Sequence, residues 1–566
     1  MTIGDGLPES ASRASGEPTR TVSADVLRGL LTGGINEPAR KFRLQGARIA
    51  GKLDLTGAAL VVPIDFQDCS FDEPVTLVGL TVPSVNLRGC HLPSLEASRL
   101  KTRDLDASDG FNAKSVRLDQ ADVSGSVMFD DATLHNPGKV AFFGRALNVG
   151  QFLSLGNGFT AHGKVDLVGA TVGKSLVFTG ATLNHPGEFA LDAQGVSVGF
   201  AVFLGSSISN PLGFTALGGI RLIDARIDQF LCCWQGRIEN PGGYAIAAQG
   251  MNIRQTLLMQ NGFSAVGTID LNESAIGGSF HLSNADLDGG DGCALTAERM
   301  ECGASLKLAE KVVVRGSVTL DAAIIVDRLE LVDADLSGCP SLNLAYLRAR
   351  SLVFSPSCPP SEMDLRHAAV AVLADDIDCW PKEYSLQDFS YDQLGRGSDP
   401  SASRRIEWLR RNKEGYLPHP YEQLIAVYRR RGDERAVRRV SVAKMRHQRT
   451  ALNWAGKAWN LLLQVAVGYG YRTWQAGIWL LLLVILGGHA FSVADGTEIV
   501  AIKQPAPSFN PYAYAAEVSI PVLNLGLRSS WAARGSAAYW CWGLTAGGWI
   551  LTTAVVAGIA RLVKRD

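Results

Sequence analysis

The chain repeats one apolar pattern along most of its length, and the clearest copies lie 49 residues apart. Within a copy, apolar residues form pairs two positions apart, such as Val165 with Leu167 and Ala170 with Val172. Successive pairs begin five or six residues apart. A period of two is typical of a strand, and a fixed long repeat is typical of stacked units that bury a core only against their neighbours. The sequence therefore predicts a β-solenoid over residues 42–379.

Each 49-residue block contains two rounds of the pattern, because Leu147 and Leu153 begin further pairs before Val165. A block therefore holds about eight short faces, which predicts two four-sided coils. Asn-Pro-Gly or His-Pro-Gly recurs at one point of the block, where Pro fixes φ and Gly supplies positive φ for a turn. One block is 55 residues long, and its six extra residues fall between Leu204 and Phe214. We expect them to form a loop on one face.

Small residues recur at alternate inward positions, each two before a larger aliphatic residue: Ala47, Ala121, Ala170, Ala225, Ala285 and Ala334. This arrangement resembles the pentapeptide-repeat solenoids, whose five-residue unit places a small residue two positions before a central aliphatic one. The resemblance covers residues 42–375 and implies a mainly β protein with a right-handed quadrilateral β-solenoid. Because steps of six residues depart from pentapeptide spacing, we expect less regular corners.

The residues before the solenoid differ from it in composition. Residues 1–21 are polar, contain Pro and lack an apolar core, so we expect a disordered tail and no signal peptide. Within residues 22–41, Ser23 is a residue suited to cap a helix. The apolar residues behind it are Val26, Leu27, Leu30 and Leu31. This stretch predicts an N-terminal helical cap that protects the open edge of the first coil.

The sequence contains no arrangement typical of a catalytic, cofactor-binding or metal site. Its ten cysteines form no Cys-x-x-Cys pair, and His and Cys do not cluster at metal-ligand spacing. Cys232 and Cys233 are adjacent, but Cys233 falls on an inward position, which favours a small buried hydrophobe over a redox role. The glycines Gly156 and Gly158 fall in a solenoid corner and do not open a nucleotide-binding helix. The sequence therefore predicts no catalytic residue, no cofactor and no metal.

The charge of the chain is divided unequally. Residues 1–380 contain 30 Lys and Arg against 42 Asp and Glu, whereas residues 381–566 contain 24 against 13. Residues 380–457 are interpreted as a basic helical juxtamembrane region, with a helical hairpin that bends at Gly432. The hairpin looks like one tetratricopeptide-type unit, which should dock on the solenoid end or a neighbour because it cannot bury its apolar face alone. We expect a patch that binds anionic lipid to contain Arg429, Arg430, Arg431, Arg435, Arg438, Arg439, Lys444, Arg446 and Arg449.

Two long apolar stretches follow the basic region. Residues 473–494 and 535–562 contain uncharged runs of 22 and 26 residues, and a bilayer span needs ~20, so we expect two transmembrane helices. Lys and Arg precede the first helix and follow the second, which predicts a cell-membrane protein with both termini and the solenoid in the cytoplasm. The remaining segments are predicted to be an interfacial segment at 458–472, an extracellular loop at 495–534 and a cytoplasmic tail at 563–566.

Two arrangements of these helices stay open. Gly543 and Gly547 form a Gly-x-x-x-Gly face that packs either against the first helix of the same chain or against another subunit. In the second arrangement, a loop containing Pro521, Asn524 and Gly526 re-enters the membrane and lines a constriction, because loop backbone is tolerated there only around a cavity or inside protein. The loop has no acidic ring and no filter-like string, so the single-chain anchor is the favoured interpretation.

Five longer motifs resemble a known family. They are FRLQGARIAGKLDL at the start of the solenoid, GC-x-LPSLEA at 89–97, the hairpin YEQL…YRRRGDERAVRRV, GYGYRTW before the first apolar stretch and GWILTTAVVAGIARL in the second. Over nearly the full chain they are similar to an actinobacterial family of pentapeptide-repeat-like membrane proteins, often labelled membrane-associated oxidoreductase. That label implies redox activity, for which the residues supply no motif.

The sequence is therefore compatible with three functions. The favoured one is a non-enzymatic, membrane-anchored scaffold, whose solenoid binds a cytoplasmic protein and whose basic region rests on anionic lipid. The first alternative is an oligomeric two-span pore, formed by a homo-oligomer through the membrane spans. The second is the oxidoreductase that the family label implies. Nucleic acid is not an expected partner, because no aromatic interleaving or groove-reading motif accompanies the arginines.

Overall fold

The computed structural model describes six segments of the chain: 20–33, 42–206, 212–448, 473–494, 498–503 and 505–563. Most of the predicted disordered tail, the predicted interfacial segment at 458–472 and the last three residues of the predicted cytoplasmic tail lie outside the described residues. The chain divides into two compact units, Met1–Gln423 and Leu424–Asp566.

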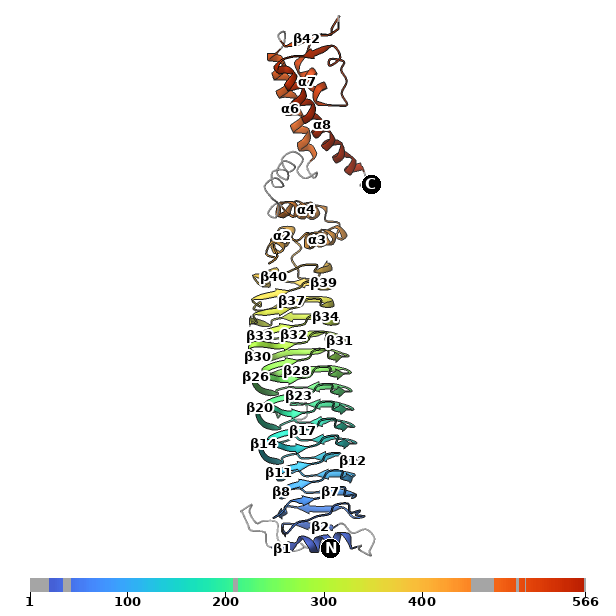
Figure 1. The fold of residues 1–566 in the computed structure, drawn as a ribbon, viewed down its shortest axis with the longest axis vertical. Helices are drawn as coiled ribbons and strands as arrows, with labels where there is room; N and C mark the ends of the chain where they lie inside the picture. Colours follow the sequence, from blue (N-terminus) through green and yellow to red (C-terminus); the bar gives the residue numbers. More distant parts are fainter. Residues whose placement is uncertain are drawn as a thin grey trace. The chain divides into compact units, whose positions relative to one another are not determined.

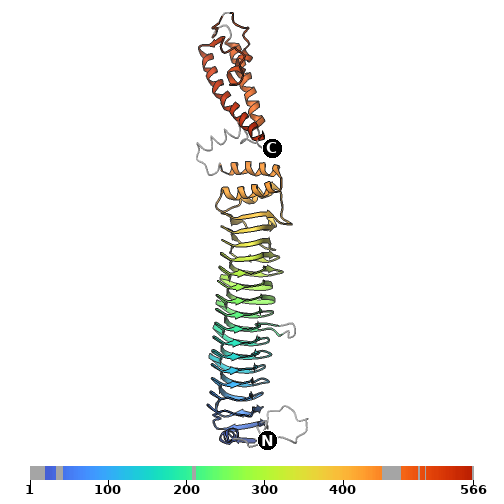
Figure 2. The ribbon, with the colours of Figure 1, turned by 90° about the vertical axis from the view of Figure 1, so that its right-hand side faces the viewer.

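The first unit is a parallel β-solenoid of about 16 turns (Figure 1, Figure 2). Its strands run from β1 (Arg20–Ser23) to β41 (Ser390–Leu394) and pair in parallel with strands of the coils before and after. The predicted mainly β solenoid is therefore confirmed. The strands of two central coils are β14 (Thr133–Phe143), β15 (Asn148–Val149), β16 (Leu153–Ser154), β17 (Thr160–Asp166), β18 (Thr171–Val172) and β19 (Leu176–Val177).

The pairing explains the 49-residue repeat. Val127 pairs with Leu153, Leu153 with Leu176, and Leu176 with Val202. These separations are 26, 23 and 26 residues, so two consecutive coils make one repeat, as predicted. Each coil has four short β segments, because β14 and β17 each cover two faces and change register at the corner between them.

The inward positions form a continuous core. Val165, Leu167, Ala170 and Val172 are each at most 1% exposed. A single coil has no second layer to cover these side chains, so burial comes from the coils on either side. The contacts that stabilise the fold are therefore mainly between neighbouring coils.

The predicted Asn-Pro-Gly turns lie at one corner of alternate coils. At the first of them Gly138 has a φ of 71°, and the Asn136 side-chain amide donates to the Val140 carbonyl at 2.7 Å. The Asn240 amide makes the equivalent bond to the Tyr244 carbonyl at 2.9 Å. The Asn side chain thus closes the turn that Pro and Gly begin.

The 55-residue block keeps the register of its neighbours. Its extra residues lie between β22 (Ala201–Phe203) and β23 (Thr215–Arg221), and Val202 still pairs with Leu231 of the next coil. The insertion therefore leaves the strands unchanged, as predicted for a loop; residues 207–211 themselves lie outside the described part of the chain.

A strand and a helix begin the solenoid. α1 (Ala24–Thr32) is the helix that the sequence predicted, although Val26 and Leu30 are exposed. β1 precedes α1, was not predicted, and pairs in parallel with β3 (Ala47–Ala50). The side of α1 that faces the protein contains Ala24, Leu27 and Leu31.

The solenoid extends beyond its predicted end. β40 (Glu383–Ser385) and β41 pair in parallel with β38 (Glu362–Asp364) and β39 (Ala369–Asp375). The 3-10 helix η1 (Ile377–Cys379) interrupts the five-and-six spacing before this last pairing. The final coil therefore does not continue the repeat in the sequence.

α2 (Ala402–Arg410) buries a charged residue against the last coils. Arg405 is 0% exposed, and its guanidinium donates to the two carboxylate oxygens of Asp375 at 2.7 and 2.8 Å. The same carboxylate accepts from Trp380 Nε1 at 2.8 Å, and the Trp380 ring lies 5.0 Å from that of Trp408. Arg405 belongs to the basic stretch of the sequence, but it forms a buried ion pair and is no part of a basic surface.

The second unit contains the C-terminal helices. α3 (Pro418–Arg430) crosses the boundary between the units and is followed, after a bend at Gly432, by α4 (Glu434–Gln448). The bend was predicted, and Gly432 has a φ of 73°. The remaining elements are α6 (Thr473–Val493), β42 (Ile499–Ala501), α7 (Pro511–Ser519), β43 (Trp531–Ala533) and α8 (Ser536–Val563), with β42 and β43 antiparallel.

The helices α6, α7 and α8 share a buried core formed by Phe491, Tyr514, Val518, Leu527 and Leu544. α6 and α8 occupy the positions of the two predicted transmembrane helices. Within the described residues, however, no helix has both the length and the apolar character needed to cross a membrane.

Candidate interaction surfaces

One face of the solenoid, here named the ion-pair face, contains Asp166, Asp192 and Arg221 at consecutive coils. Arg145 Nε lies 2.8 Å from Asp166 Oδ2, while Lys164 Nζ and Arg221 lie 2.7 and 3.0 Å from Asp192 Oδ2. The carboxylate of Asp166 raises the pKa of Arg145. These charges compensate one another across coils, so they tie neighbouring coils together and leave little free charge for a ligand.

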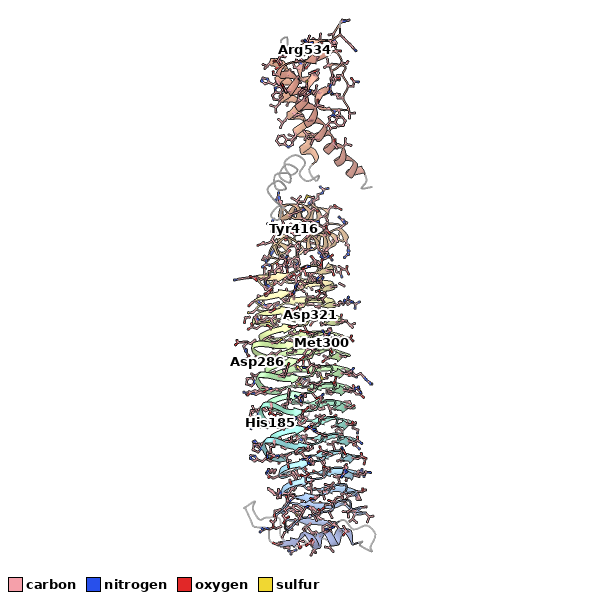
Figure 3. All side chains as sticks on the ribbon, viewed as in Figure 1. His185, Asp286, Met300, Asp321, Tyr416 and Arg534 are labelled. Carbon is pink, nitrogen blue, oxygen red and sulfur yellow. The ribbon has the colours of Figure 1, made fainter. Side chains whose placement is uncertain are left out.

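A second face, two corners further along each coil, carries apolar side chains on its outer side. Outward positions of a solvated sheet are expected to be polar. Parallel register instead aligns Met128, Ser154, Val177, Phe203, Cys232 and Leu258 on six consecutive coils. We name this row the apolar face. All of its residues but Ser154 are apolar; Cys232 is only 3% exposed, and the other five residues are half-buried. Figure 3 draws the side chains of all the coils together, inward and outward ones alike.

Aromatic rings border the apolar face. Phe152 and Phe200 are 40% and 45% exposed, and the Phe230 ring lies 5.7 Å from that of Phe200 and 5.6 Å from that of Phe203. One position of the neighbouring corner is glycine on successive coils, because a Cβ there would overlap a backbone carbonyl of the preceding coil. The glycines concerned are Gly150, Gly173 and Gly199. The aromatic rings therefore lie next to these glycines, and Lys174 Nζ lies 5.2 Å from the centre of the Phe152 ring.

Sequence reasoning missed the apolar face because it followed only the inward positions. The signal was nevertheless present: Val177 lies between two inward residues, Leu176 and Phe178, and makes three consecutive apolar residues where alternation requires a polar one.

The predicted lipid-binding patch falls on α3 and α4. Seven of its arginines are exposed: Arg429, Arg430, Arg431, Arg435, Arg438, Arg439 and Arg446. Lys444 is half-buried, and Arg449 lies outside the described residues. The other side of α4 buries Ala436, Val437, Val440 and Ala443. Eight of the nine predicted residues therefore lie on α3 and α4, and none of these eight is buried.

Close contacts between α7 and α8 involve a glycine that the sequence analysis did not single out. A Cβ at Gly548 would overlap the backbone carbonyl of Ser519 at the end of α7. Gly543 and Gly547, the pair predicted to pack helices, are less crowded than Gly548. A Cβ at Gly547 would lie 3.5 Å from Leu483, and a Cβ at Gly543 would meet no atom within 4 Å. The sequence signal for the close contact is the third glycine, directly after the Gly-x-x-x-Gly pair.

Replacement of Gly548 by Ala should lower the stability of the second unit by about 1–3 kcal/mol, because the added methyl group must displace α7. Gly543→Ala is the matched control: its methyl group enters open space, and Ala favours a helix by up to ~1 kcal/mol over Gly. Thermal unfolding of the full chain checks both. An equal midpoint for the two variants would contradict the packing of α7 on α8.

A buried carboxylate holds the loop between α7 and β43. Glu517 accepts the backbone N–H groups of residues 527 and 528 at 2.8 and 3.1 Å. Of the three residues predicted to line a pore, Asn524 accepts from the Gly526 N–H at 3.2 Å, Gly526 has a φ of 76°, and Pro521 lies in the turn after α7. The loop is therefore ordered by contacts within one chain.

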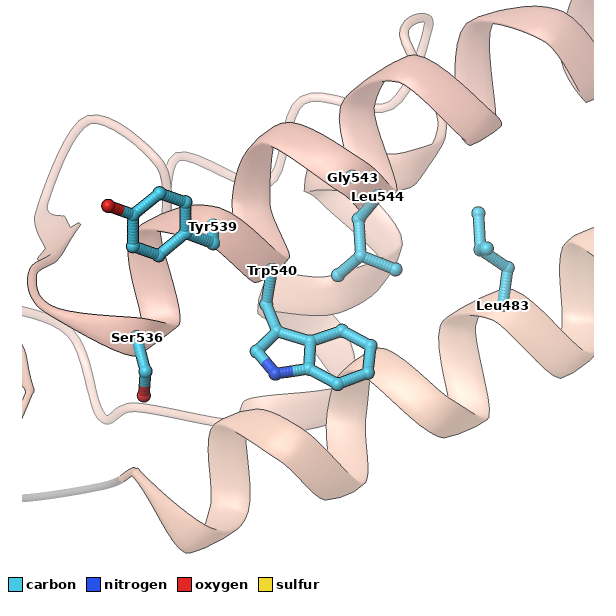
Figure 4. Close-up of a pocket in the computed structure, with 6 residues that line it drawn as sticks. All are labelled: Leu483, Ser536, Tyr539, Trp540, Gly543 and Leu544. Atoms are coloured by element: carbon cyan, nitrogen blue, oxygen red, sulfur yellow. The ribbon is translucent and has the colours of Figure 1, made fainter.

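The outer surfaces of α6 and α8 are apolar, and an open hollow of about 430 Å³ lies between them (Figure 4). Leu483, Ser536, Tyr539, Trp540, Gly543 and Leu544 line it. The exposed large apolar side chains of the two helices are Ile478, Trp479, Leu481, Leu482, Ile485, Leu486, Val493, Tyr539, Trp540, Trp542, Trp549, Ile550 and Val556. Contiguous exposed apolar surface of this extent marks contact with lipid or with protein.

All ten cysteines are free thiols, and the adjacent pair Cys232 and Cys233 has little reactivity at neutral pH. Burial raises the pKa of Cys232, and it raises that of Cys233 well above the ordinary value, so both stay protonated. Across the described residues, no three His, Cys, Asp or Glu side chains are placed to hold a metal ion.

Comparison with known proteins gives no relative: no family model matches the chain, and no curated protein or solved structure is significantly similar to it.

Proposed function

We propose that the protein is a non-enzymatic scaffold, attached to the cell membrane, whose solenoid binds a protein partner in the cytoplasm. The apolar face is the observation that supports this most directly. Val177, Phe203 and Leu258 are outward and apolar on consecutive or alternate coils, with exposed aromatic rings beside them. Such surfaces commonly mark protein contacts. A right-handed quadrilateral solenoid, of the kind that pentapeptide repeats form, would extend such a surface without altering the core.

Membrane attachment is proposed from the exposed surfaces of α6 and α8. Burial of a large apolar side chain is worth about 1.5–3 kcal/mol relative to water, so thirteen exposed ones strongly favour an apolar surrounding. The arginines on α3 and α4 would add attraction to anionic lipid, at about 1 kcal/mol per residue near the surface. The two-span topology, with both termini in the cytoplasm, is the specific form of this proposal.

Cysteine labelling tests the topology. In a Ser508→Cys variant, the new thiol should react with a membrane-impermeant maleimide on intact cells, because the loop between α6 and α8 carries few positive charges. In a Ser401→Cys variant, the new thiol should react only after lysis. The wild-type chain measures background from its ten free cysteines. Protection of both new thiols on intact cells would contradict the two-span topology. Release of the protein from membranes by alkaline carbonate would contradict attachment itself.

A pore is the second candidate, and the position of α7 favours it. This short helix packs against both α6 and α8 and precedes the loop of Pro521, Asn524 and Gly526. A pore would be formed by several copies, with this loop around the axis. Proteoliposomes of the purified protein should be tight to ions if the scaffold proposal holds. A tetramer or pentamer that conducts, and stops conducting in an Asn524→Trp variant, would favour the pore.

The oxidoreductase function rests on the family resemblance alone. If the protein is an oxidoreductase, the purified chain should bind a redox group. An absorption spectrum and a nucleotide assay of the released small molecules test this. A stoichiometric flavin, haem, iron–sulfur cluster or nicotinamide would overturn the non-enzymatic proposal.

A further inference from the structure

We infer that the apolar face binds one amphipathic α-helix of the partner protein, lying parallel to the stack of coils. The inference rests on the proposed scaffold function and adds the kind of partner. Three observations carry it: the spacing of the apolar side chains, the small area of the face and the charges at its two ends.

The spacing of the apolar face matches that of a helix. Neighbouring parallel strands lie about 4.8 Å apart, so each coil offers one outward side chain at that interval. On a helix, residues three or four apart on one side recur about every 5.3 Å along the axis. Six coils, from Met128 to Leu258, span about 24 Å, the length of about 16 helical residues.

The area of the apolar face suits a helix better than a second copy of the chain. Each coil contributes about four residues to the face, or about 13 Å, so the whole face covers about 300 Å². A stable dimer buries about 800 Å² on each partner. The side of one helix about 10 Å wide and 24 Å long fits the smaller area. Phe152 and Phe200 at the edge would then contact its flank.

Charged residues at the two ends of the apolar face give the bound helix a direction. Asp106 occupies the outward position one coil before Met128, and Lys307 occupies that of the second coil after Leu258. His281 lies on the coil between Leu258 and Lys307, but burial lowers its pKa, so it is uncharged at neutral pH. Asp106 lies 3.9 Å from Arg88, and Lys307 lies 3.7 Å from Glu330. A helix has a partial positive charge at its N-terminus and a partial negative charge at its C-terminus. The N-terminus of the partner helix should therefore lie toward Asp106.

A synthetic peptide tests the inference with the full-length protein in phosphatidylcholine nanodiscs. The probe is an 18-residue fluorescent peptide with Leu at every third or fourth position and a photo-crosslinker near each end. Its control has the same sequence except for a central proline, which breaks the helix. The helical probe should bind more tightly than the control and should bind little to nanodiscs without protein. The crosslinker near its N-terminus should react near Met128, and the one near its C-terminus near Leu258.

Variants connect this binding to the apolar face. Val177→Lys should weaken the probe about tenfold, the loss typical of a central interface residue, and Phe152→Ala, at the edge of the face, should weaken it by a smaller factor. Ser197→Lys, at an exposed outward position of the neighbouring face, should change binding less than about twofold. Circular dichroism checks that each variant is folded, and Phe152→Ala alters an exposed ring that the core does not need.

Three results would overturn the inference: no binding of the helical probe, equal binding of the proline control, or equal affinity for Val177→Lys. If the wild-type chain instead forms a dimer that Val177→Lys dissociates, a second copy occupies the face. The scaffold proposal would survive that result. Its membrane part is tested separately by labelling and carbonate extraction, so the two can fail independently.

Discussion

A Leu222→Asp variant should unfold the solenoid around its position, at a cost of about 3–5 kcal/mol, because it buries a charge without a partner. Leu222 is 1% exposed and follows β23 in the middle of the stack. Each coil is covered by the next, so the defect should expose neighbouring coils as well. Limited proteolysis should then cleave within the solenoid, where the wild-type chain resists.

The matched control for this variant is Asn252→Asp, which places the same side chain at an exposed outward position of the solenoid. Equal protease resistance of the two variants would contradict the inward register. Arg221, next to Leu222, is outward but unsuitable as a neutral control. Its guanidinium pairs with Asp192 at 3.0 Å and lies 4.0 Å from the Phe189 ring.

An Arg405→Met variant should destabilise the C-terminal end of the solenoid by about 3–5 kcal/mol, since it leaves the buried carboxylate of Asp375 without its cation. Arg404→Met is the control from the adjacent position, where the arginine is exposed and pairs with exposed Asp378; its unfolding midpoint should equal that of wild type. Thermal unfolding measures both.

A double variant separates the ion pair from simple packing. In Arg405→Met with Asp375→Leu no charge is left buried, so this chain should be more stable than Arg405→Met alone. If the single and double variants unfold at the same temperature, Arg405 stabilises the end of the solenoid through its aliphatic part and not through charge.

The sequence by itself determined the solenoid. Alternation at Val165, Leu167, Ala170 and Val172 fixes which side chains face inward, and the 49-residue repeat fixes two coils per block. The α1 helix and the bend at Gly432 were predicted from local sequence, although the Ser23 side chain makes no cap hydrogen bond to α1. These features can be predicted because they depend on residues close together in the chain, whose spacing sets which side of a strand or helix each side chain occupies.

Tertiary structure alone decided the features that depend on distant residues. The apolar face joins side chains 23 to 29 residues apart, and Arg405 meets Asp375 across 30 residues. A basic stretch in the sequence cannot show which arginine is buried, and a glycine motif cannot show that Gly548 touches α7. The physical reason is that the energies of apolar contacts and ion pairs depend on distance in space, and the stacking of coils sets which residues become neighbours.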